Sequence, residues 1–294
     1  MAGNASPYRQ LPEIWQPRLL ADAVRLKQQL GDDAVYAAGA TWLRTQWENG
    51  RPQPGHLISL EQIRELGGFR TDEHGGLEIG AAVTLGDCCV RHEVSRSAGL
   101  LADAIGRIAA PAVRNLATLG GNVCSRTGDA LPALLAHEAG LEIYRDGSYR
   151  RLTLVRWLEN TAEHREDLIV RICIPGSTEV SATSRDISFY SKLGRREAFT
   201  PSLVTIALAG RQLADGTLTG IRLALGGGTA PPLRLKEVET LLEGGRSDRA
   251  TLLRAGELVR AGYGAATDSH ADAAYRKEAA ANLLTAHLWS ATRF

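Results

Sequence analysis

The stretch "NLATLGGNVCSRTGD", residues 115–129, lies near the middle of the 294-residue chain and combines paired glycines with small polar residues and a terminal acid. Glycine has no Cβ and tolerates positive φ, so Gly120 and Gly121 would let the backbone approach a ligand closely and direct successive N–H groups at it. Such a concavity suits a phosphate or pyrophosphate. The same pattern also fits a tight turn packed on a helix, and spacing alone leaves both interpretations open.

Polar residues of this segment, which we call the glycine loop, extend the binding hypothesis. Thr118 offers a hydroxyl, Asn122 an amide, and Asp129 a carboxylate that would accept from sugar or polyol hydroxyls. A second small-residue turn, "AAGAT" at 37–41, offers further backbone N–H groups. Two such loops would clamp a dinucleotide pyrophosphate with backbone dipoles and few formal charges.

The glycine loop does not match the common nucleotide-binding motifs. A P-loop needs Lys-Ser/Thr after its second glycine, whereas Asn122 and Val123 follow Gly121. Adjacent glycines also break the G-x-G-x-x-G spacing of a Rossmann fold, and "GYGAAT" at 262–267 is a partial match in a region that reads as helix. The sequence contains no H-E-x-x-H or G-x-S-x-G motif.

Composition indicates an ordinary globular chain of about two domains. Hydrophobic residues make up 44% and charged residues 23%. The net charge of +1 provides no concentrated positive field for nucleic acid or an anionic membrane. No segment approaches the roughly 20 apolar residues of a membrane span, and the N-terminus lacks the apolar core of a signal peptide.

The four cysteines, Cys88, Cys89, Cys124 and Cys173, form no C-x-x-C pair and no iron–sulfur or zinc spacing. We therefore expect them to be semi-buried small hydrophobic residues, and we expect no metal on this chain. Reduced thiols fit a cytoplasmic location.

Hydrophobic periodicity predicts a mixture of helices and strands in the first half. We expect a helix at 19–30 ended by Gly31, a strand from residue 34 that ends at Gly39, a strand at 76–83, a helix at 100–117 interrupted by Pro111, a helix at 130–140, a hairpin at 141–154 around Asp146-Gly147, and a strand at 168–175. Asp129 is placed to cap the helix at 130–140, and Pro132 fits its first turn.

The polar stretch "GSTEVSATSRD" at 176–186 is the best candidate for a domain boundary. Beyond it we expect two strands within 202–227, joined at Asp215-Gly216, and then helices at 234–243, 248–262 and 271–291. Strands and helices are segregated here rather than alternating, which is typical of an α+β fold.

The two small-residue loops carry a family resemblance. "AAGATWL" at 37–43 is similar to an A-G-G-T-D-L loop, and "ATLGGN…D…LPALLA" resembles A-T-I-G-G-N…D…P-x-L-L-A. Together they mark the FAD-binding medium subunit of the molybdenum hydroxylases, the xanthine dehydrogenase and carbon monoxide dehydrogenase family. The resemblance covers about residues 8–290, with later matches in "EDLIVRICIP", "YSKLGRREAFTPSLVTIALA", "LALGGGTAPPLRLKEVETLLEG" and "YRKEAAANLL".

The resemblance implies an α+β fold in two domains. Residues 1–178 would form a two-lobed FAD-binding domain of the vanillyl-alcohol-oxidase-like type, with lobes at about 1–62 and 63–178. Residues 185–294 would form a smaller C-terminal domain of antiparallel sheet plus helices.

The resemblance also implies a cofactor site. The two loops would hold the FAD pyrophosphate, and Asp129 would bind ribose or ribityl hydroxyls. Lys192 would lie near the flavin ring, where a cation favours the negative charge of reduced flavin, unless it is simply a solvated surface lysine. The implied cofactor-binding residues are Tyr36, Ala37, Ala38, Gly39, Ala40, Thr41, Trp42, Ile108, Thr118, Leu119, Gly120, Gly121, Asn122, Asp129, Ile169 and Lys192.

Three residues depart from the family pattern. Ala40 stands where the family has its second glycine, and its methyl group is expected to be tolerated only if φ is negative. Trp42 replaces an aspartate, so it either packs on the ligand or fills the core. Thr200 replaces another aspartate in a segment after Lys192.

The function implied by the resemblance is electron transfer. An iron–sulfur small subunit and a molybdopterin large subunit would be the partners, because this chain lacks the cysteines for [2Fe-2S] centres. Electrons would pass from those centres to FAD and on to NAD⁺, a quinone or oxygen, so the chain would be an oxidoreductase subunit without catalytic side chains of its own. Xanthine or another purine is the substrate that analogy favours.

Two alternatives come from other functional classes. The departures at Ala40, Trp42 and Thr200 suggest a flavin-free assembly subunit, which would be colourless but still bind its partners. A stand-alone flavin oxidoreductase of the vanillyl-alcohol-oxidase type would turn over a small substrate alone. No His-x-Cys pattern for covalent flavin attachment occurs, so we expect His92, His137 and His164 to be surface or structural residues.

Overall fold

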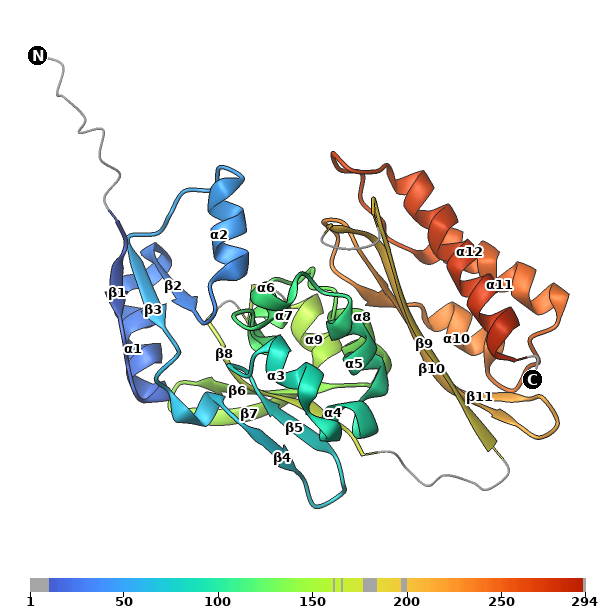
Figure 1. Cartoon of the computed structure of the whole chain (residues 1–294), viewed down its shortest axis with the longest axis horizontal. Coiled ribbons are helices and arrows are strands. Elements are labelled where there is room, and N and C mark those ends of the chain that lie inside the picture. The colour runs from blue at the N-terminus through green and yellow to red at the C-terminus, as the bar shows by residue number, and fades with distance from the viewer. Residues whose placement is uncertain (1–10, 161, 165, 177–183, 197–199, 293–294) are drawn as a thin grey trace, which may run out of the picture.

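The computed structural model describes residues 11–160, 162–164, 166–176, 184–196 and 200–292. Three sheets follow one another along the long axis of the molecule (Figure 1). The first is a small parallel sheet, and the second and third are antiparallel. Most of segment 176–186, expected to be a boundary, lies outside the described residues.

The first sheet has the strand order β1-β3-β2. Its elements are β1 (Glu13–Trp15), α1 (Leu20–Leu30), β2 (Ala34–Ala37), α2 (Thr41–Glu48) and β3 (His56–Ser59), with a short 3₁₀ turn at Gly31–Asp33. Helix α1 ends at Gly31 as expected, and the φ of 60° at this residue is one that glycine adopts readily. Strand β2 ends at Ala37, and the turn beyond it leads into α2, a helix that the sequence analysis did not predict.

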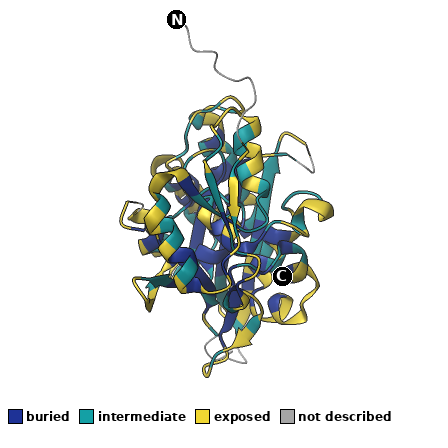
Figure 2. Ribbon diagram, turned by 90° about the vertical axis from the view of Figure 1, so that its left-hand side faces the viewer, coloured by how far each residue is buried: buried dark blue, intermediate teal, exposed yellow. Residues whose placement is uncertain are grey.

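The second sheet has the order β4-β5-β8-β6-β7, and helices gather on one side of it (Figure 1). Its strands are β4 (Phe69–Thr71), β5 (Leu77–Gly80), β6 (Gly140–Arg145), β7 (Ser148–Thr153) and β8 (Leu168–Ile174), and a 3₁₀ turn spans Arg64–Leu66. The helices are α3 (Leu85–Val90), α4 (His92–Ser97), α5 (Gly99–Gly106), α6 (Pro111–Arg114), α7 (Leu119–Cys124), α8 (Leu131–Ala136) and α9 (Leu154–Glu159). The main hydrophobic core lies between these helices and the sheet, and Figure 2 shows the buried residues inside an exposed outer layer.

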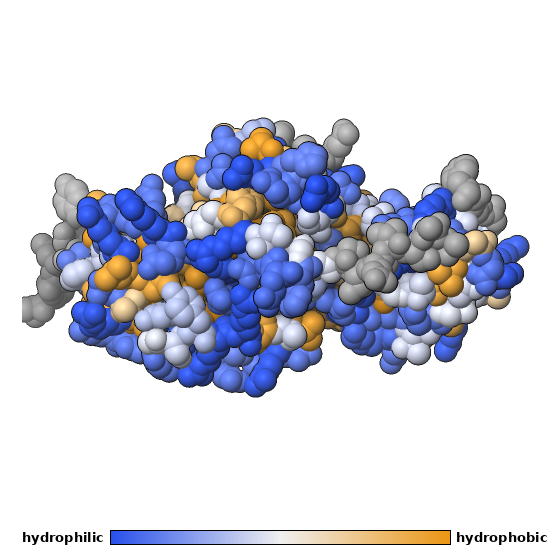
Figure 3. All heavy atoms as spheres, turned by 90° about the horizontal axis from the view of Figure 1, so that it is seen from below, coloured by the Kyte–Doolittle hydropathy of each residue, from blue (hydrophilic) through white to orange (hydrophobic). Residues whose placement is uncertain are grey.

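The opposite face of this sheet is charged. Arg151 on β7 pairs with Glu78 and Glu142, and Arg171 on β8 also pairs with Glu142. Side chains alternate between the two faces of a strand, so these residues point away from the helices that cover their apolar neighbours. The view from below shows hydrophilic side chains over much of this side, with apolar areas between them (Figure 3).

The helical segment expected at 100–117 is interrupted before Pro111, as predicted, but the first helix, α5, already ends at Gly106, and Pro111 starts α6 at a position where proline is favourable. One local expectation in this region needs correction. Asp129 does not cap α8. The cap residue is Ala130, whose N–H is instead bound by the side-chain oxygen of Asn122 at 3.2 Å. Pro132 does lie in the first turn, as expected.

The third sheet has the order β12-β11-β10-β9 and is built from the last third of the chain. Its strands are β9 (Ser184–Gly194), β10 (Ser202–Leu213), β11 (Leu218–Gly226) and β12 (Leu233–Arg234), followed by α10 (Lys236–Leu242), α11 (Arg249–Gly262) and α12 (Ala273–Ala291). The expected turn at Asp215-Gly216 joins β10 to β11, where Gly216 has a φ of 87°. The three helices cover one face of the sheet, and α8 contacts the other (Figure 1).

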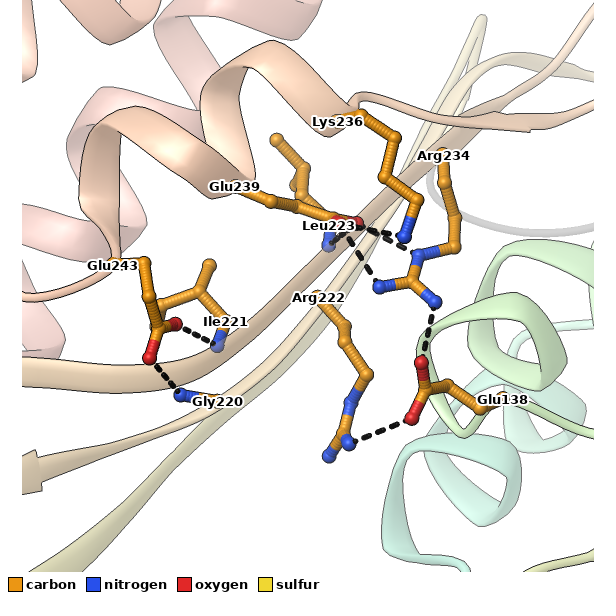
Figure 4. Close-up of polar contacts among 9 residues, drawn as sticks. All are labelled: Glu138, Gly220, Ile221, Arg222, Leu223, Arg234, Lys236, Glu239 and Glu243. Carbon is orange, nitrogen blue, oxygen red and sulfur yellow. Dashed lines mark hydrogen bonds and ion pairs between the residues drawn. The ribbon is translucent and has the colours of Figure 1, made fainter.

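A polar network crosses the contact between α8 and the third sheet (Figure 4). Glu138, just after α8, binds Arg222 of β11 at 3.1 Å and Arg234 of β12 at 2.7 Å. Arg234 also binds Glu239 of α10, whose carboxylate accepts from the N–H of Leu223. These shared partners lower the pKa of Glu138 and Glu239 through hydrogen bonds and charge, against the opposing effect of burial.

The same contact predicts a dependence of stability on pH. Burial, and secondarily the charge of Arg222, lowers the pKa of His137 from 6.5 to about 4. The unfolded chain therefore binds this proton first as the pH falls, so the free energy of unfolding should decrease between pH 6.5 and 4, by at most about 3 kcal/mol. Urea titrations across this range should show a shallower decrease for His137→Gln, which carries no titrating ring. An unchanged profile in the variant would contradict this assignment.

Arg276 on α12 is fully buried and fixes a corner of the third sheet. Its guanidinium binds both carboxylate oxygens of Asp268 at 2.7 Å and donates to the carbonyl of Leu203. A Cβ at Gly228 would lie 2.7 Å from the guanidinium carbon, so glycine is needed there.

Arg276→Met is expected to lower the free energy of unfolding by about 3 kcal/mol, because it leaves Asp268 and a buried carbonyl without their partner. Urea denaturation is the measurement. Arg260→Met is the matched control, since Arg260 pairs with Glu278 on the surface and should change stability by less than about 1 kcal/mol. Equal losses of unfolding free energy in the two variants would show that the burial of Arg276 adds nothing to the stability of the protein.

Candidate functional site

The structure brings the two small-residue loops together. A Cβ built on Gly39 would lie 1.6 Å from the carbonyl oxygen of Leu116 and 3.2 Å from the backbone nitrogen of Ala117. Only a residue without a side chain permits this approach. The turn after β2 and the glycine loop therefore form one continuous backbone surface, as the sequence led us to expect.

The backbone N–H groups of the glycine loop form hydrogen bonds within the protein, unlike those of a phosphate-binding nest. The backbone N–H groups of Leu119 and Gly120 donate to Val83 and Ala81, and that of Asn122 donates to Thr118, all at 2.9 Å. The N–H of Gly121 donates to the Thr118 side chain, which caps α7. The expectation that these four groups point at a ligand is therefore wrong, because each already has a partner within the protein.

The paired glycines have different roles. A Cβ on Gly120 would lie 2.6 Å from the carbonyl oxygen of Ala81, so this buried glycine allows α7 to pack against the end of β5. Gly121 is exposed, and among the described residues a Cβ there would meet only the Thr118 hydroxyl, at 3.0 Å. Gly121 is therefore the one whose missing side chain leaves the loop surface open.

The start of α2 supplies the backbone donors that the glycine loop does not. The first N–H groups of a helix have no partner within the helix, and they lie at the positive end of its dipole. Ala40 precedes α2 and offers no side-chain cap. Thr41 and Trp42 begin the helix, and Trp42 is 45% exposed, which excludes the interpretation that it fills the core.

Ala40 adopts the left-handed conformation, with φ of 51° and ψ of 6°. The φ is positive, so the condition under which the methyl group was expected to be tolerated is not met. The backbone here requires the conformation that glycine takes without strain, and alanine adopts it at a cost of about 1 kcal/mol. The methyl group therefore lowers the stability of the folded chain.

A charged pair lies beside these loops. Lys192 on β9 places its Nζ 2.8 Å from Oδ2 of Asp129, and its side chain is only 11% exposed, so it is not a solvated surface lysine. The same Nζ donates to the carbonyl of Arg107 at 3.2 Å. Because Arg107 precedes Ile108, this hydrogen bond places the turn that contains Ile108 beside the Lys192–Asp129 pair. Arg114 holds the turn by donating to the carbonyl of Ile108 at 2.9 Å.

Other predicted residues lie deeper. Ile169 on β8 is 4% exposed and belongs to the main core, with Leu119 and Ala37 also buried. The Tyr36 hydroxyl is buried and has no hydrogen-bond partner among the described residues. Burial, and secondarily the charge of Glu166, raises the pKa of Tyr36, so the phenol stays protonated and able to donate.

Sequence reasoning missed two residues at this site. The hydroxyl of Ser202, the first residue of β10, binds Oδ1 of Asp129, and the Tyr190 hydroxyl donates to the Asp129 carbonyl at 2.9 Å. Both come from the third sheet, far along the chain from Asp129, and no local pattern marks them. Thr200 is partly buried and contacts the backbone near Gly194.

The histidines and cysteines do not add chemistry here. His92 is exposed, and buried His164 pairs with Asp167 at 2.6 Å, as expected of surface and structural residues. Cys88 is buried, but Cys89 and Cys124 are exposed, so the expectation of four semi-buried thiols is wrong for these two. Within the described ranges, no His, Cys, Asp and Glu cluster could hold a metal ion, and no helix is long and apolar enough to cross a bilayer.

Two protein families match this chain, one over its first part and the other over its last part. Residues 8–177 match the family described as the FAD binding domain in molybdopterin dehydrogenase. Residues 188–291 match the CO dehydrogenase flavoprotein C-terminal domain.

The relatives that share 28% sequence identity with this chain include two bacterial subunits. One is the putative xanthine dehydrogenase FAD-binding subunit of Escherichia coli K12, aligned over 82% of each chain. The other is the carbon monoxide dehydrogenase medium chain of Hydrogenophaga pseudoflava, aligned over 92% of this chain and 94% of the relative. A solved structure of carbon monoxide dehydrogenase from that organism superposes with a TM-score of 0.86 at 27% identity, over 96% of this chain and 97% of the other.

Proposed function

Because this chain belongs to the FAD-binding domain family of the molybdopterin dehydrogenases, we propose that it is the FAD-carrying electron-transfer subunit of a heteromeric molybdenum hydroxylase. The observation that carries the proposal is the contact of Gly39 with Leu116, which joins two loops separated by more than seventy residues of sequence. Two turns that served only the fold would not need to approach each other this closely. The chain is an oxidoreductase subunit of the xanthine dehydrogenase and carbon monoxide dehydrogenase type.

The residues present fit FAD. The uncapped start of α2, with the N–H groups of Thr41 and Trp42, would bind the pyrophosphate, and the exposed face of Gly121 would leave room for it. The carboxylate of Asp129, 17% exposed, would accept from ribose or ribityl hydroxyls. Lys192 would place positive charge near the isoalloxazine. FAD, when bound, supplies the redox chemistry, and these side chains bind and orient it.

The limits of the two domains are also proposed from the family resemblance. We propose a FAD-binding domain at residues 1–178, with lobes at about 1–62 and 63–178, and a C-terminal domain at 185–294. The two family matches, at 8–177 and 188–291, support these limits. The first two sheets would belong to the FAD-binding domain and the third to the C-terminal domain.

The finer assignments rest on the family resemblance. We propose an iron–sulfur small subunit and a molybdopterin large subunit as partners, NAD⁺ or another acceptor such as a quinone or oxygen as the electron acceptor, and a cytoplasmic location. A purine such as xanthine is the proposed substrate of the whole complex, supported by the Escherichia coli relative. Carbon monoxide is the second candidate, because the carbon monoxide dehydrogenase medium chain is equally similar.

The visible spectrum of the purified chain, with the released cofactor identified by mass, tests the proposed cofactor. We expect a two-banded flavin spectrum and FAD in near-equal molar amount. A colourless protein that takes up no added FAD would overturn the proposal in favour of a flavin-free assembly subunit. Turnover of a small substrate by this chain alone would favour a stand-alone flavin oxidoreductase instead.

The substrate is tested separately, on the complex co-purified with its partner chains. Xanthine-dependent reduction of NAD⁺ would support the purine assignment. Oxidation of carbon monoxide without activity on purines would replace it with the second candidate.

A further inference from the structure

The carboxylate of Asp129 joins parts of the chain that are far apart in sequence. Lys192 of β9 binds Oδ2, Ser202 of β10 binds Oδ1, and the Tyr190 hydroxyl binds the backbone carbonyl of the same residue. We propose that Ser202 is a positioning residue of the cofactor site, which acts by orienting Asp129 toward the hydroxyl groups of the cofactor. The inference rests on the function proposed above, and it makes the third sheet part of the FAD site.

The chemistry of the contact fixes its direction. An ionised carboxylate accepts hydrogen bonds and donates none, so the Ser202 hydroxyl is the donor. Each carboxylate oxygen offers about two acceptor sites. Among the described residues each oxygen has one partner, Ser202 on Oδ1 and Lys192 on Oδ2, which leaves both oxygens able to accept from a sugar or polyol hydroxyl. The Asp129 side chain is 17% exposed, so part of it remains open to such a ligand.

Ser202 is itself held firmly. It is 7% exposed, and its carbonyl accepts from the N–H of Gly228 at 2.9 Å. The carbonyl of the next residue, Leu203, accepts from the buried guanidinium of Arg276. The hydroxyl is thus presented from a rigid strand end, and a side chain held in this way determines the orientation of its partner rather than following it.

The surrounding contact is close-packed with small side chains. Helices α5 and α8 meet β9 and β10 through a separate buried cluster, formed by Leu100, Ala104, Ala133, Ala136, Tyr190, Ala207 and Ala209. Alanines let the helix and strand backbones approach closely, so the distance between Asp129 and the third sheet has little freedom. The site therefore spans the contact between α8 and the third sheet. Asp129, the acceptor, lies on the side of α8, and its donors Lys192 and Ser202 lie on the third sheet.

Ser202→Ala tests the inference. Flavin-free protein is titrated with FAD, and binding is followed by the quenching of flavin fluorescence. We expect the Kd to rise about tenfold, the size of effect typical of a lost hydrogen bond to a charged group. Ser202→Thr keeps the hydroxyl and should restore binding to within about twofold of the natural chain.

A matched control separates positioning of Asp129 from the general loss of a hydroxyl on the third sheet. Thr219→Ala on β11 removes a hydroxyl that donates to the carboxylate of Glu243 at 2.9 Å. Thr219 pairs with the opposite end of β10 from Ser202, so this variant should change the Kd by less than about twofold. A second control combines Ser202→Ala with Asp129→Ala. Without the carboxylate, loss of the Ser202 hydroxyl should have almost no further effect on FAD binding.

The outcomes are distinguishable. If the natural chain binds FAD and Ser202→Ala binds it equally well, the inference is overturned and the proposed function stands. A tenfold loss that persists in the Asp129→Ala background, or that Ser202→Thr does not restore, also overturns it, because Ser202 would then act structurally. A natural chain that does not bind FAD overturns the proposed function and this inference together. If Asp129→Ala does not fold, the comparison of alanine and threonine at residue 202 decides alone.

Discussion

Gly39→Ala is expected to abolish FAD retention. The added Cβ would lie 1.6 Å from the carbonyl oxygen of Leu116, and this neighbour is backbone rather than the flexible end of a side chain. The turn after β2 and the glycine loop would have to separate, which would misalign the start of α2 with the rest of the site. Overpacking of this kind costs about 1–3 kcal/mol, so most of the chain should still fold. The ratio of FAD to protein after purification is the measurement.

The neighbouring residue provides the matched control. Ala40→Gly replaces a residue at a φ of 51° with the one residue that adopts this conformation freely. It should stabilise the chain by up to about 1 kcal/mol and leave FAD content equal or higher. The two substitutions exchange the same two residue types at adjacent positions and should act in opposite directions. FAD retention by Gly39→Ala at the level of the natural chain would refute the joint role of the two loops.

The paired glycines of the glycine loop should separate stability from cofactor binding. Gly120→Val would place a Cβ within 3.0 Å of three atoms of Ala81, in a buried position, and should lower the free energy of unfolding by about 3 kcal/mol or more. Gly121→Val meets only the Thr118 hydroxyl. It should leave the fold nearly unchanged and lower FAD content severalfold by covering the open surface of the loop. Urea denaturation of flavin-free protein and the FAD-to-protein ratio together measure both effects.

Gly99→Val is the control for this pair. Gly99 is exposed, lies at the start of α5, and has no atom within 4 Å of its built Cβ. Valine there should change neither FAD content nor stability by much. If Gly121→Val also keeps its full FAD content, the surface around Gly121 does not face the cofactor, and the placement of the pyrophosphate at the start of α2 would need revision.

Local backbone requirements were readable in the sequence. Gly31 ends α1, Pro132 lies in the first turn of α8, and Asp146-Gly147 turns the hairpin of β6 and β7 with positive φ at both residues. Each of these features depends on the conformation of one or two residues, which composition and spacing report directly. The family resemblance added FAD as the cofactor, which neither the small-residue loops nor hydrophobic periodicity could identify.

Features decided by distant residues were not readable. Helix α2 has no buried residue and no capping side chain, so neither a hydrophobic stripe nor a cap marks it in the sequence. Asp129 looked like a helix cap because it precedes α8, but Ser202, 73 residues later, and Lys192 bind its carboxylate. The sequence also showed that glycines were needed at 120 and 121 without showing that Gly120 packs against Ala81 within the protein.

The order of these contacts along the chain has a consequence for biosynthesis. Asp129 emerges from the ribosome well before Lys192 and Ser202, and the face of α8 that carries Ala133 and Ala136 stays uncovered until β9 and β10 follow. Domains generally fold from the N-terminus during translation. A nascent chain that stops before β10 would thus present Asp129 without its donor Ser202, and we expect FAD to bind only after nearly three quarters of the chain has been made.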